Sequence, residues 1–267
     1  MCRAQLTFDD GHKIFVVAKN QIGFGRAKRS KEPEIDFVMR ALPVRSCELD
    51  PENWQKSSRL SGCHGYFAYR NNTLYIKDNY SKNGIFKVPD AIVSDLCSGL
   101  TDMDATESED DSVPLLSQKA DSLKPFKKGD WSFLPDHCTI SLCKTGVLLL
   151  KTTVLRKSGK ITAFRIERLS NWPQHLYIQL ISKVIIGNSE TSAIMLQDPA
   201  VTGEVAELTW EDVAFYLKRL SDNTSVTINS RQLELDTKVM LHEGCHIRIG
   251  DTEFIYTTAT DDDFVNV

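Results

Sequence analysis

Three short groups of polar residues have side chains suited to holding an anion. They are Gly25-Arg26, Ser61-x-x-His64 and Asp78-x-x-Ser81-x-Asn83-Gly84, with Lys82 inside the last group. A guanidinium offers a planar fork of donors that can bind a phosphate through two hydrogen bonds. Hydroxyl, ammonium and amide groups add further donors. These residue types favour an anion-binding surface over a catalytic cleft.

Alternating apolar and polar residues surround these groups, which is typical of strands. We predict strands at 65–70 and 73–77, joined by a tight turn at Asn71-Asn72, because asparagine and glycine tolerate positive φ. A hairpin is predicted over 5–18, with a type I′ turn at Asp9-Asp10-Gly11. The region 210–217 has some helical periodicity, but a strand is preferred there.

The order and spacing of the three polar groups resemble the forkhead-associated (FHA) domain, a module that binds phosphothreonine peptides. The resemblance implies an eleven-stranded β-sandwich whose loops at one end hold the peptide. The residues that it implies for phosphopeptide binding are Arg26 and Ser61 on the phosphate, and Lys82 and Asn83 on the peptide backbone or phosphate. The residues that it implies for loop architecture are Gly25, His64 and Gly84.

One position departs from the family pattern. The residue after the loop serine is often arginine in the family, whereas this chain has Gly62. Arg59 lies nearby in the sequence and is expected to take that part in phosphopeptide binding.

The C-terminal part of the chain resembles the same family more faintly, so the predicted fold class is all-β, with two tandem FHA-like sandwiches. The predicted domains are residues 1–156, with an insertion at about 90–124, and residues 157–267. The insertion includes 101–112, which has six acids and no base and is predicted to be disordered. Residues 244–254 resemble the closing hairpin of the family in the second copy.

The second copy has different residues at the binding positions. Asn188 stands at the position of Arg26, Thr202 near that of Ser61, and Val205 near that of His64, while Thr224-Ser225 replaces the Asn-Gly turn. Without the arginine, no fixed charge offsets the cost of desolvating a phosphate. We therefore predict that the second domain does not bind phosphothreonine through this face. Its expected role is packing on the first domain, self-association or binding an unmodified partner.

Composition narrows the functional classes. The formal charge of -4 argues against a general nucleic-acid binder. No apolar run is long enough to span a bilayer, so no membrane role is expected. Seven cysteines without paired spacing favour reduced thiols in the cytoplasm or nucleus.

The residue patterns of the sequence do not favour an enzyme or a metal site. The sequence contains no Gly-x-Ser-x-Gly elbow, P-loop or His-Glu-x-x-His motif. Ser61 and His64 could form a nucleophile and base, but a serine and histidine three apart in a loop more often stabilise that loop. Cys63-His64 and Cys245-His246 lack the paired spacing of a zinc site. No enzyme activity, metal or cofactor is expected.

The sequence thus predicts a non-enzymatic phosphothreonine-binding adaptor in kinase-linked signalling, whose partner is a phosphothreonine-containing protein. The alternative is a scaffold that binds an unphosphorylated protein or itself. Thr106 and Thr260 precede acidic residues, as acidophilic kinases prefer. Once phosphorylated, either could dock on Arg26 and cause autoinhibition or self-association, although an inert acidic loop is the preferred interpretation.

Overall fold

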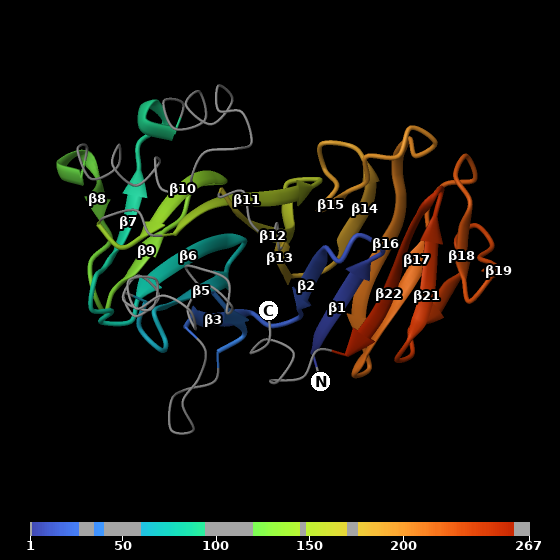
Figure 1. The fold of residues 1–267 in the computed structure, drawn as a ribbon, viewed down its shortest axis with the longest axis horizontal. Helices are drawn as coiled ribbons and strands as arrows, with labels where there is room; N and C mark the ends of the chain where they lie inside the picture. Colours follow the sequence, from blue (N-terminus) through green and yellow to red (C-terminus); the bar gives the residue numbers. More distant parts are fainter. Residues whose placement is uncertain are drawn as a thin grey trace.

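The computed structural model describes residues 2–26, 35–39, 60–93, 120–144, 148–169 and 176–258. In these ranges the chain is built almost entirely of strands, with one helical turn at 90–93 and a short 3-10 helix, η1 (Ala120–Ser122) (Figure 1). The predicted all-β class is therefore confirmed. The predicted acidic segment at 101–112 lies outside the described residues.

The strands of the N-terminal half are β1 (Arg3–Phe8), β2 (Lys13–Val17), β3 (Gln21–Gly25), β4 (Phe37–Val38), β5 (Gly65–Arg70), β6 (Thr73–Asp78), β7 (Ile85–Val88), β8 (Lys124–Pro125), β9 (Trp131–Phe133), β10 (His137–Leu142) and β11 (Leu149–Lys157). The strands of the C-terminal half are β12 (Lys160–Arg168), β13 (Leu176–Leu180), β14 (Val184–Asn188), β15 (Ile194–Met195), β16 (Gly203–Glu211), β17 (Ala214–Arg219), β18 (Val226–Ile228), β19 (Arg231–Gln232), β20 (Lys238–Met240), β21 (Cys245–Ile249) and β22 (Thr252–Thr258).

Two of the predicted turns differ in outcome. Asn71 and Asn72 have φ values of 50° and 55°, as the tight turn between β5 and β6 requires. The β1–β2 hairpin is present, but its type I′ turn was wrong, because the loop spans four residues. The Phe8 N–H donates to the His12 carbonyl at 2.8 Å, and the Asp10 carboxylate accepts the His12 N–H at 2.9 Å. That side-chain bond stabilises the longer loop.

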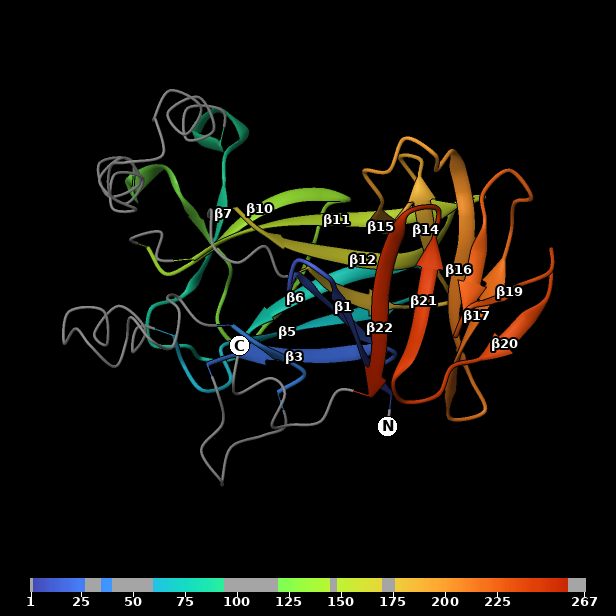
Figure 2. The same cartoon turned by 45° about the vertical axis from the view of Figure 1, so that its right-hand side comes forward.

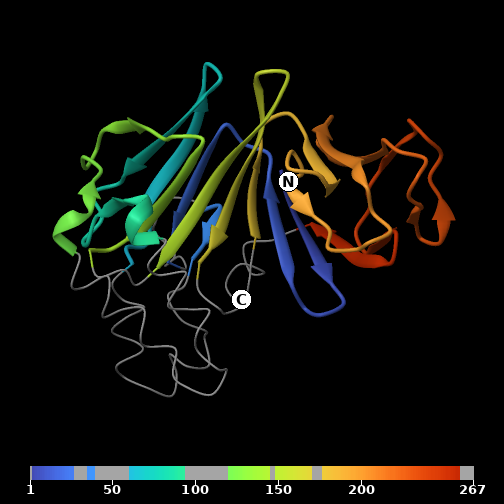
Figure 3. The same cartoon turned by 90° about the horizontal axis from the view of Figure 1, so that it is seen from above.

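The strands form one twelve-stranded sheet and two five-stranded sheets. The large sheet has the order β19-β18-β21-β22-β1-β2-β13-β12-β11-β10-β7-β8, and the small sheets have the orders β4-β3-β5-β6-β9 and β15-β14-β16-β17-β20. Figures 2 and 3 show the long sheet continuing through both halves of the molecule. The preference for strands over a helix at 210–217 is confirmed, since β16 and β17 form a hairpin there.

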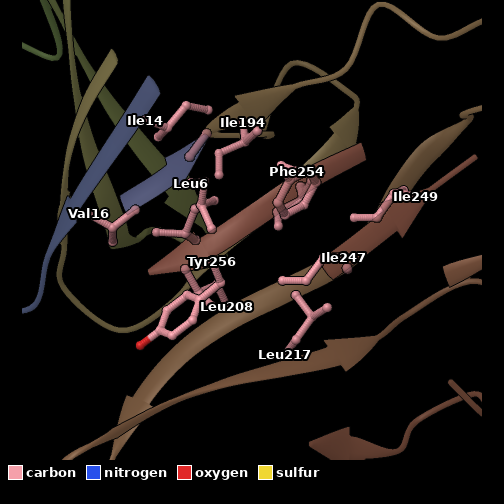
Figure 4. Packing of buried hydrophobic residues seen from close by; sticks show 14 of the residues in the cluster. Leu6, Ile14, Val16, Ile194, Leu208, Leu217, Ile247, Ile249, Phe254 and Tyr256 are labelled. Carbon is pink, nitrogen blue, oxygen red and sulfur yellow. The ribbon is translucent and has the colours of Figure 1, made fainter. Parts of the chain in front are cut away.

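The two small sheets cover opposite faces of the large one. Side chains on β2 alternate between two cores, as successive residues of a strand do. Ile14 and Val16 enter the core of the β14–β17 sheet, whereas Phe15 and Val17 enter the core of the β3–β6 sheet. Figure 4 shows Leu6, Ile14 and Val16 directed toward side chains of the C-terminal half. The molecule is thus two sandwiches that share one sheet.

We call the first the N-terminal sandwich, made of β4-β3-β5-β6-β9 and β13-β12-β11-β10-β7-β8, and the second the C-terminal sandwich, made of β15-β14-β16-β17-β20 and β2-β1-β22-β21-β18-β19. Each has the same order when β12–β13 is matched to β1–β2. The hairpins are exchanged: β1 and β2 complete the C-terminal sandwich, while β12 and β13 complete the N-terminal one.

The predicted domain boundary, between residues 156 and 157, falls at the end of β11. As a division of the sequence into two copies it stays a prediction. In space, each core takes strands from both sides of it. In the described ranges, no helix is long and apolar enough to cross a membrane.

Candidate functional site

A close backbone contact brings Arg26 to the predicted site. A Cβ atom on Gly25 would lie 2.0 Å from the carbonyl oxygen of Gly62, so only glycine fits between β3 and this loop. The Arg26 N–H then donates to the Ser61 carbonyl at 3.1 Å. In the described part of the chain, no ion pair or side-chain hydrogen bond occupies the half-buried Arg26 guanidinium.

His64 joins two loops from a fully buried position. The Ser61 N–H donates to Nδ1 at 3.1 Å, which places the ring proton on Nε2, and Nε2 donates to the Gly84 carbonyl at 3.1 Å. Burial lowers the pKa of His64 below its usual 6.5, although the bond to Gly84 and the charge of Asp78 oppose this. The ring is therefore a neutral connector with both nitrogen atoms engaged, and neither is available as a catalytic base.

The turn after β6 is ordered by buried side chains. The Asp78 carboxylate accepts the N–H groups of Ser81 at 2.7 Å and Ile85 at 3.1 Å. The Ser81 hydroxyl accepts the Gly84 N–H at 3.0 Å, and Gly84 has a φ of 81° that suits glycine. Asp78 and Ser81 thus shape the turn. Their place in the motif was recognised from the sequence, but no role was assigned to them.

This turn meets the serine loop through one hydrogen bond. The Lys82 N–H donates to the Ser61 hydroxyl oxygen at 3.0 Å. The Ser61 hydroxyl proton is then free to point elsewhere. The Lys82 side chain is exposed, and Asn83 is half-buried. The structure therefore brings Arg26, Ser61 and Lys82 into one loop cluster, whereas Arg59 lies outside the described residues.

Sequence reasoning missed two residues beside this cluster. Lys128, from the segment before β9, donates from Nζ to the Ser81 carbonyl at 2.5 Å. Tyr80 is 74% exposed and has a φ of 52°, and its ring lies against Gly129, where a Cβ would be 2.4 Å from the Tyr80 hydroxyl. A bulky residue at positive φ is uncommon and is often found at binding sites.

The corresponding loops of the C-terminal half share the backbone geometry but not the chemistry. A Cβ on Gly187 would also lie 2.0 Å from a carbonyl, that of Gly203. This close approach supports the alignment of Asn188 with Arg26. The Asn188 side chain donates to the Val201 carbonyl at 3.3 Å, and the Thr224 hydroxyl donates to the Ala200 carbonyl at 3.2 Å. Both polar groups are thus used to hold their own loops.

In the C-terminal half, the turn after β17 is ordered by a cation, whereas the turn after β6 is ordered by a carboxylate. Arg219 ends β17 as Asp78 ends β6. Its guanidinium donates to the carbonyls of Ser221, Asp222 and Leu233 at 2.7, 3.1 and 2.9 Å. A cation that binds carbonyls has replaced a carboxylate that binds N–H groups.

The fold and the loop cluster together define the class of protein. It is a β-sandwich protein whose polar loops gather at one end of the strands. The family model of the FHA domain matches residues 184–250, from β14 to the turn after β21. Residues 184–250 are therefore similar to the FHA domain, and this match lies in the C-terminal half of the chain. The match does not extend to the N-terminal half, so the presence of two tandem copies stays a prediction. No curated protein matches the chain.

Solved structures of FHA domains match parts of the chain. The FhaA FHA domain, in a complex with the intracellular domain of Rv3910, is 25% identical over 28% of this chain and 79% of its own, with a TM-score of 0.26. An FHA domain from Arabidopsis thaliana is 18% identical over 30% and 69%, with a TM-score of 0.28. The N-terminal FHA domain of Rad53p from S. cerevisiae, in a complex with a phosphothreonine peptide, is 16% identical over 32% and 72%, with a TM-score of 0.28.

Proposed function

We propose that the N-terminal sandwich is an FHA domain that binds phosphothreonine peptides. In this proposal the chain is a non-enzymatic adaptor in kinase-linked signalling, in the cytoplasm or nucleus. The supporting observation is the loop cluster, where the main chain of Arg26 bonds to Ser61 and the Ser61 hydroxyl accepts the Lys82 N–H. In this proposal, the three loops present a guanidinium, a hydroxyl and an ammonium group to the same phosphate.

The chemistry of the cluster suits a phosphate ester. Phosphothreonine brings about -1.5 to -2 charge and three acceptor oxygens. Arg26 supplies a bidentate cation, the Ser61 hydroxyl proton is available to donate, and the exposed Lys82 adds charge. Asn83, and Arg59 if it approaches, would hold the peptide backbone or the phosphate.

The C-terminal half is proposed not to bind phosphothreonine. Besides the absence of the arginine, Glu204 follows the glycine that corresponds to Gly62. Burial acts to raise the pKa of Glu204, but its pairing with Lys157 and the hydrogen bond from the Thr191 hydroxyl at 2.8 Å together leave that pKa below its usual value. A carboxylate at that position repels a phosphate.

A second candidate function is a scaffold that binds an unphosphorylated protein or itself. The family match favours it, because the matched half is the one without the arginine. Self-association through phosphorylated Thr106 or Thr260 stays a prediction, since both residues lie outside the described ranges. Identical mass and elution of kinase-treated wild type and Thr106→Ala would contradict the proposed role of Thr106.

Titration with a degenerate phosphothreonine peptide library separates the two functions. We expect saturable binding, weakened about 10- to 100-fold by Arg26→Ala or Ser61→Ala, because each change removes hydrogen bonds to a charged group. Asn188→Ala, the matched change in the C-terminal half, is expected to leave the affinity unchanged. Absence of binding by the wild type, or equal affinity of Arg26→Ala, would favour the scaffold.

A further inference from the structure

The exchanged hairpins follow from the short connection between the halves. Only Ser158 and Gly159 separate β11 from β12, with φ values of 52° and 75°. Positive φ at both central residues is the type I′ turn of a two-residue hairpin. The strand after such a turn must pair with the strand before it, and β12 pairs with β11 over its full length. β12 therefore occupies the position beside β11.

The N-terminal hairpin occupies the equivalent position in the other sandwich. β1 pairs antiparallel with β22, with Leu6 opposite Tyr256. β2 then pairs in parallel with β13, which joins the two sandwiches into one sheet. Figure 1 shows β1 and β2 lying between β13 and β22. Each core in this structure therefore takes strands from both halves of the chain.

The exchanged β12 and β13 carry a large part of the N-terminal core. Phe164 is fully buried, and its ring lies 4.9 Å from that of Phe67 in an edge-to-face contact. Tyr177 contacts Phe15 at 5.4 Å and Phe37 at 5.0 Å between ring centroids. These aromatic contacts join β5, β2 and β4 to strands of the C-terminal half.

Two side chains of β13 reach the strands that carry the candidate site. The Tyr177 hydroxyl donates to the Val38 carbonyl at 3.1 Å, and Val38 pairs with Gly25, the residue before Arg26. The Gln179 amide donates to the Lys19 carbonyl at 2.8 Å, just before β3. Burial raises the pKa of Tyr177 to about 12, so its hydroxyl stays protonated and keeps donating.

We propose that the C-terminal half is an integral part of the phosphothreonine site: its β12–β13 hairpin completes the sandwich, and Tyr177 acts as a positioning residue for Arg26. Two consequences follow. The halves unfold as one cooperative unit, and the site depends on a hydrogen bond from the half that binds no phosphate. The second consequence rests on the proposed function; the first does not.

The cooperative unit is tested on the full chain with two single-tryptophan variants. One keeps Trp131 in β9 of the N-terminal sandwich, and the other keeps Trp210 in β16 of the C-terminal sandwich, with the remaining tryptophans changed to phenylalanine. Urea unfolding followed by fluorescence is expected to give the same midpoint for both reporters.

A core change in each half makes this test sharper. Leu208→Ala, in the C-terminal core, is expected to lower the midpoint of both reporters equally, and so is Leu74→Ala in the N-terminal core. Separate transitions, or a shift of only the reporter in the mutated half, would overturn the cooperative unit. Neither result depends on whether any peptide binds.

The positioning role is tested by peptide affinity. Tyr177→Phe is expected to weaken phosphothreonine-peptide binding about 3- to 10-fold, the loss of one hydrogen bond, at temperatures where the protein stays folded. Tyr256→Phe, the matched change at a buried tyrosine of the C-terminal core, is expected to leave the affinity unchanged. Equal affinities of wild type and Tyr177→Phe would overturn the positioning role. If the wild type binds no peptide, the proposed function fails and the positioning role fails with it, whereas the unfolding curves still decide the first consequence.

Discussion

At the scale of single residues, the two halves show how one backbone can carry different chemistry. The close approach at Gly25 is repeated at Gly187, but the next residue is arginine in one half and asparagine in the other. The family match falls on residues 184–250, the half without the arginine. The family match therefore follows the scaffold, and phosphate binding has to be argued from the individual side chains.

The sequence allowed only some of these side chains to be found. Gly25, Arg26, Ser61 and His64 were predicted because they match the spaced motifs through which the sequence resembles the FHA family. Lys128 was not, because its contact with Ser81 joins residues 47 positions apart. Arg219 was also missed, since a cation that replaces a carboxylate keeps neither its charge nor its hydrogen-bond pattern.

The lowered pKa of His64 predicts how the stability of the folded protein depends on pH. Its folded pKa lies below the unfolded value of 6.5, because burial disfavours the charged ring. The unfolded chain therefore binds more protons below that pH, and the folded state loses stability as the pH falls. We expect the wild type to keep full stability above about pH 6.5 and to lose it progressively toward pH 5, relative to His64→Gln.

Urea unfolding at several pH values would measure this difference. His246→Gln changes an exposed histidine of the C-terminal half and should retain the wild-type pH dependence. If His64→Gln shows the same slope as the wild type between pH 7 and 5, the ring does not stay neutral in the folded protein.

At the scale of strands and turns, local patterns predicted the elements well. The runs at 65–70 and 73–77 became β5 and β6 because period-two alternation and the Asn71-Asn72 turn agree with each other. Partner choice was not predicted, since alternation says which face of a strand is buried but not which strand lies beside it. The sequence signal for the pairing of β11 with β12 was the short connection of two residues between Lys157 and Lys160.

The two glycines at the strand ends predict a contrast between stability and binding. Gly25→Ala and Gly187→Ala both place a Cβ 2.0 Å from a carbonyl oxygen, so each must push a loop away. We expect both to destabilise the protein by roughly 1–3 kcal/mol, as overpacking does. Gly25→Ala alone is expected to abolish phosphothreonine-peptide binding, because it moves Ser61 away from Arg26.

Paired measurements of the urea midpoint and the peptide affinity would separate these effects. Gly159→Ala is a useful third variant, because nothing lies within 4 Å of its Cβ and only its φ of 75° is unfavourable. Equal affinities of the Gly25→Ala and Gly187→Ala proteins would show that the β3 end does not shape the binding site.

At the scale of the whole molecule, a buried ion pair joins the exchanged hairpin to the site-bearing sheet. Arg3 lies on β1, which completes the C-terminal sandwich, whereas Asp36 lies just before β4 of the N-terminal sandwich. Their side chains approach to 2.9 Å and are 4% and 5% exposed. Asp36 also pairs with Lys19 at 2.6 Å and accepts the Gly23 N–H at 3.0 Å. One carboxylate thus connects β1, β3 and β4.

Removing that carboxylate should destabilise both sandwiches together. Asp36→Ala removes a buried carboxylate that pairs with Arg3 and Lys19, and removing one partner of a buried pair costs about 3–5 kcal/mol. Asp136→Ala is the matched control, because its pair with Arg156 is 44% and 33% exposed, and such pairs contribute at most about 1 kcal/mol. The Trp131 and Trp210 reporters should show the same loss for Asp36→Ala, since the pair spans both sandwiches. A loss confined to Trp131, or one no larger than that of Asp136→Ala, would mean that the exchanged hairpin is held by its strand pairing alone.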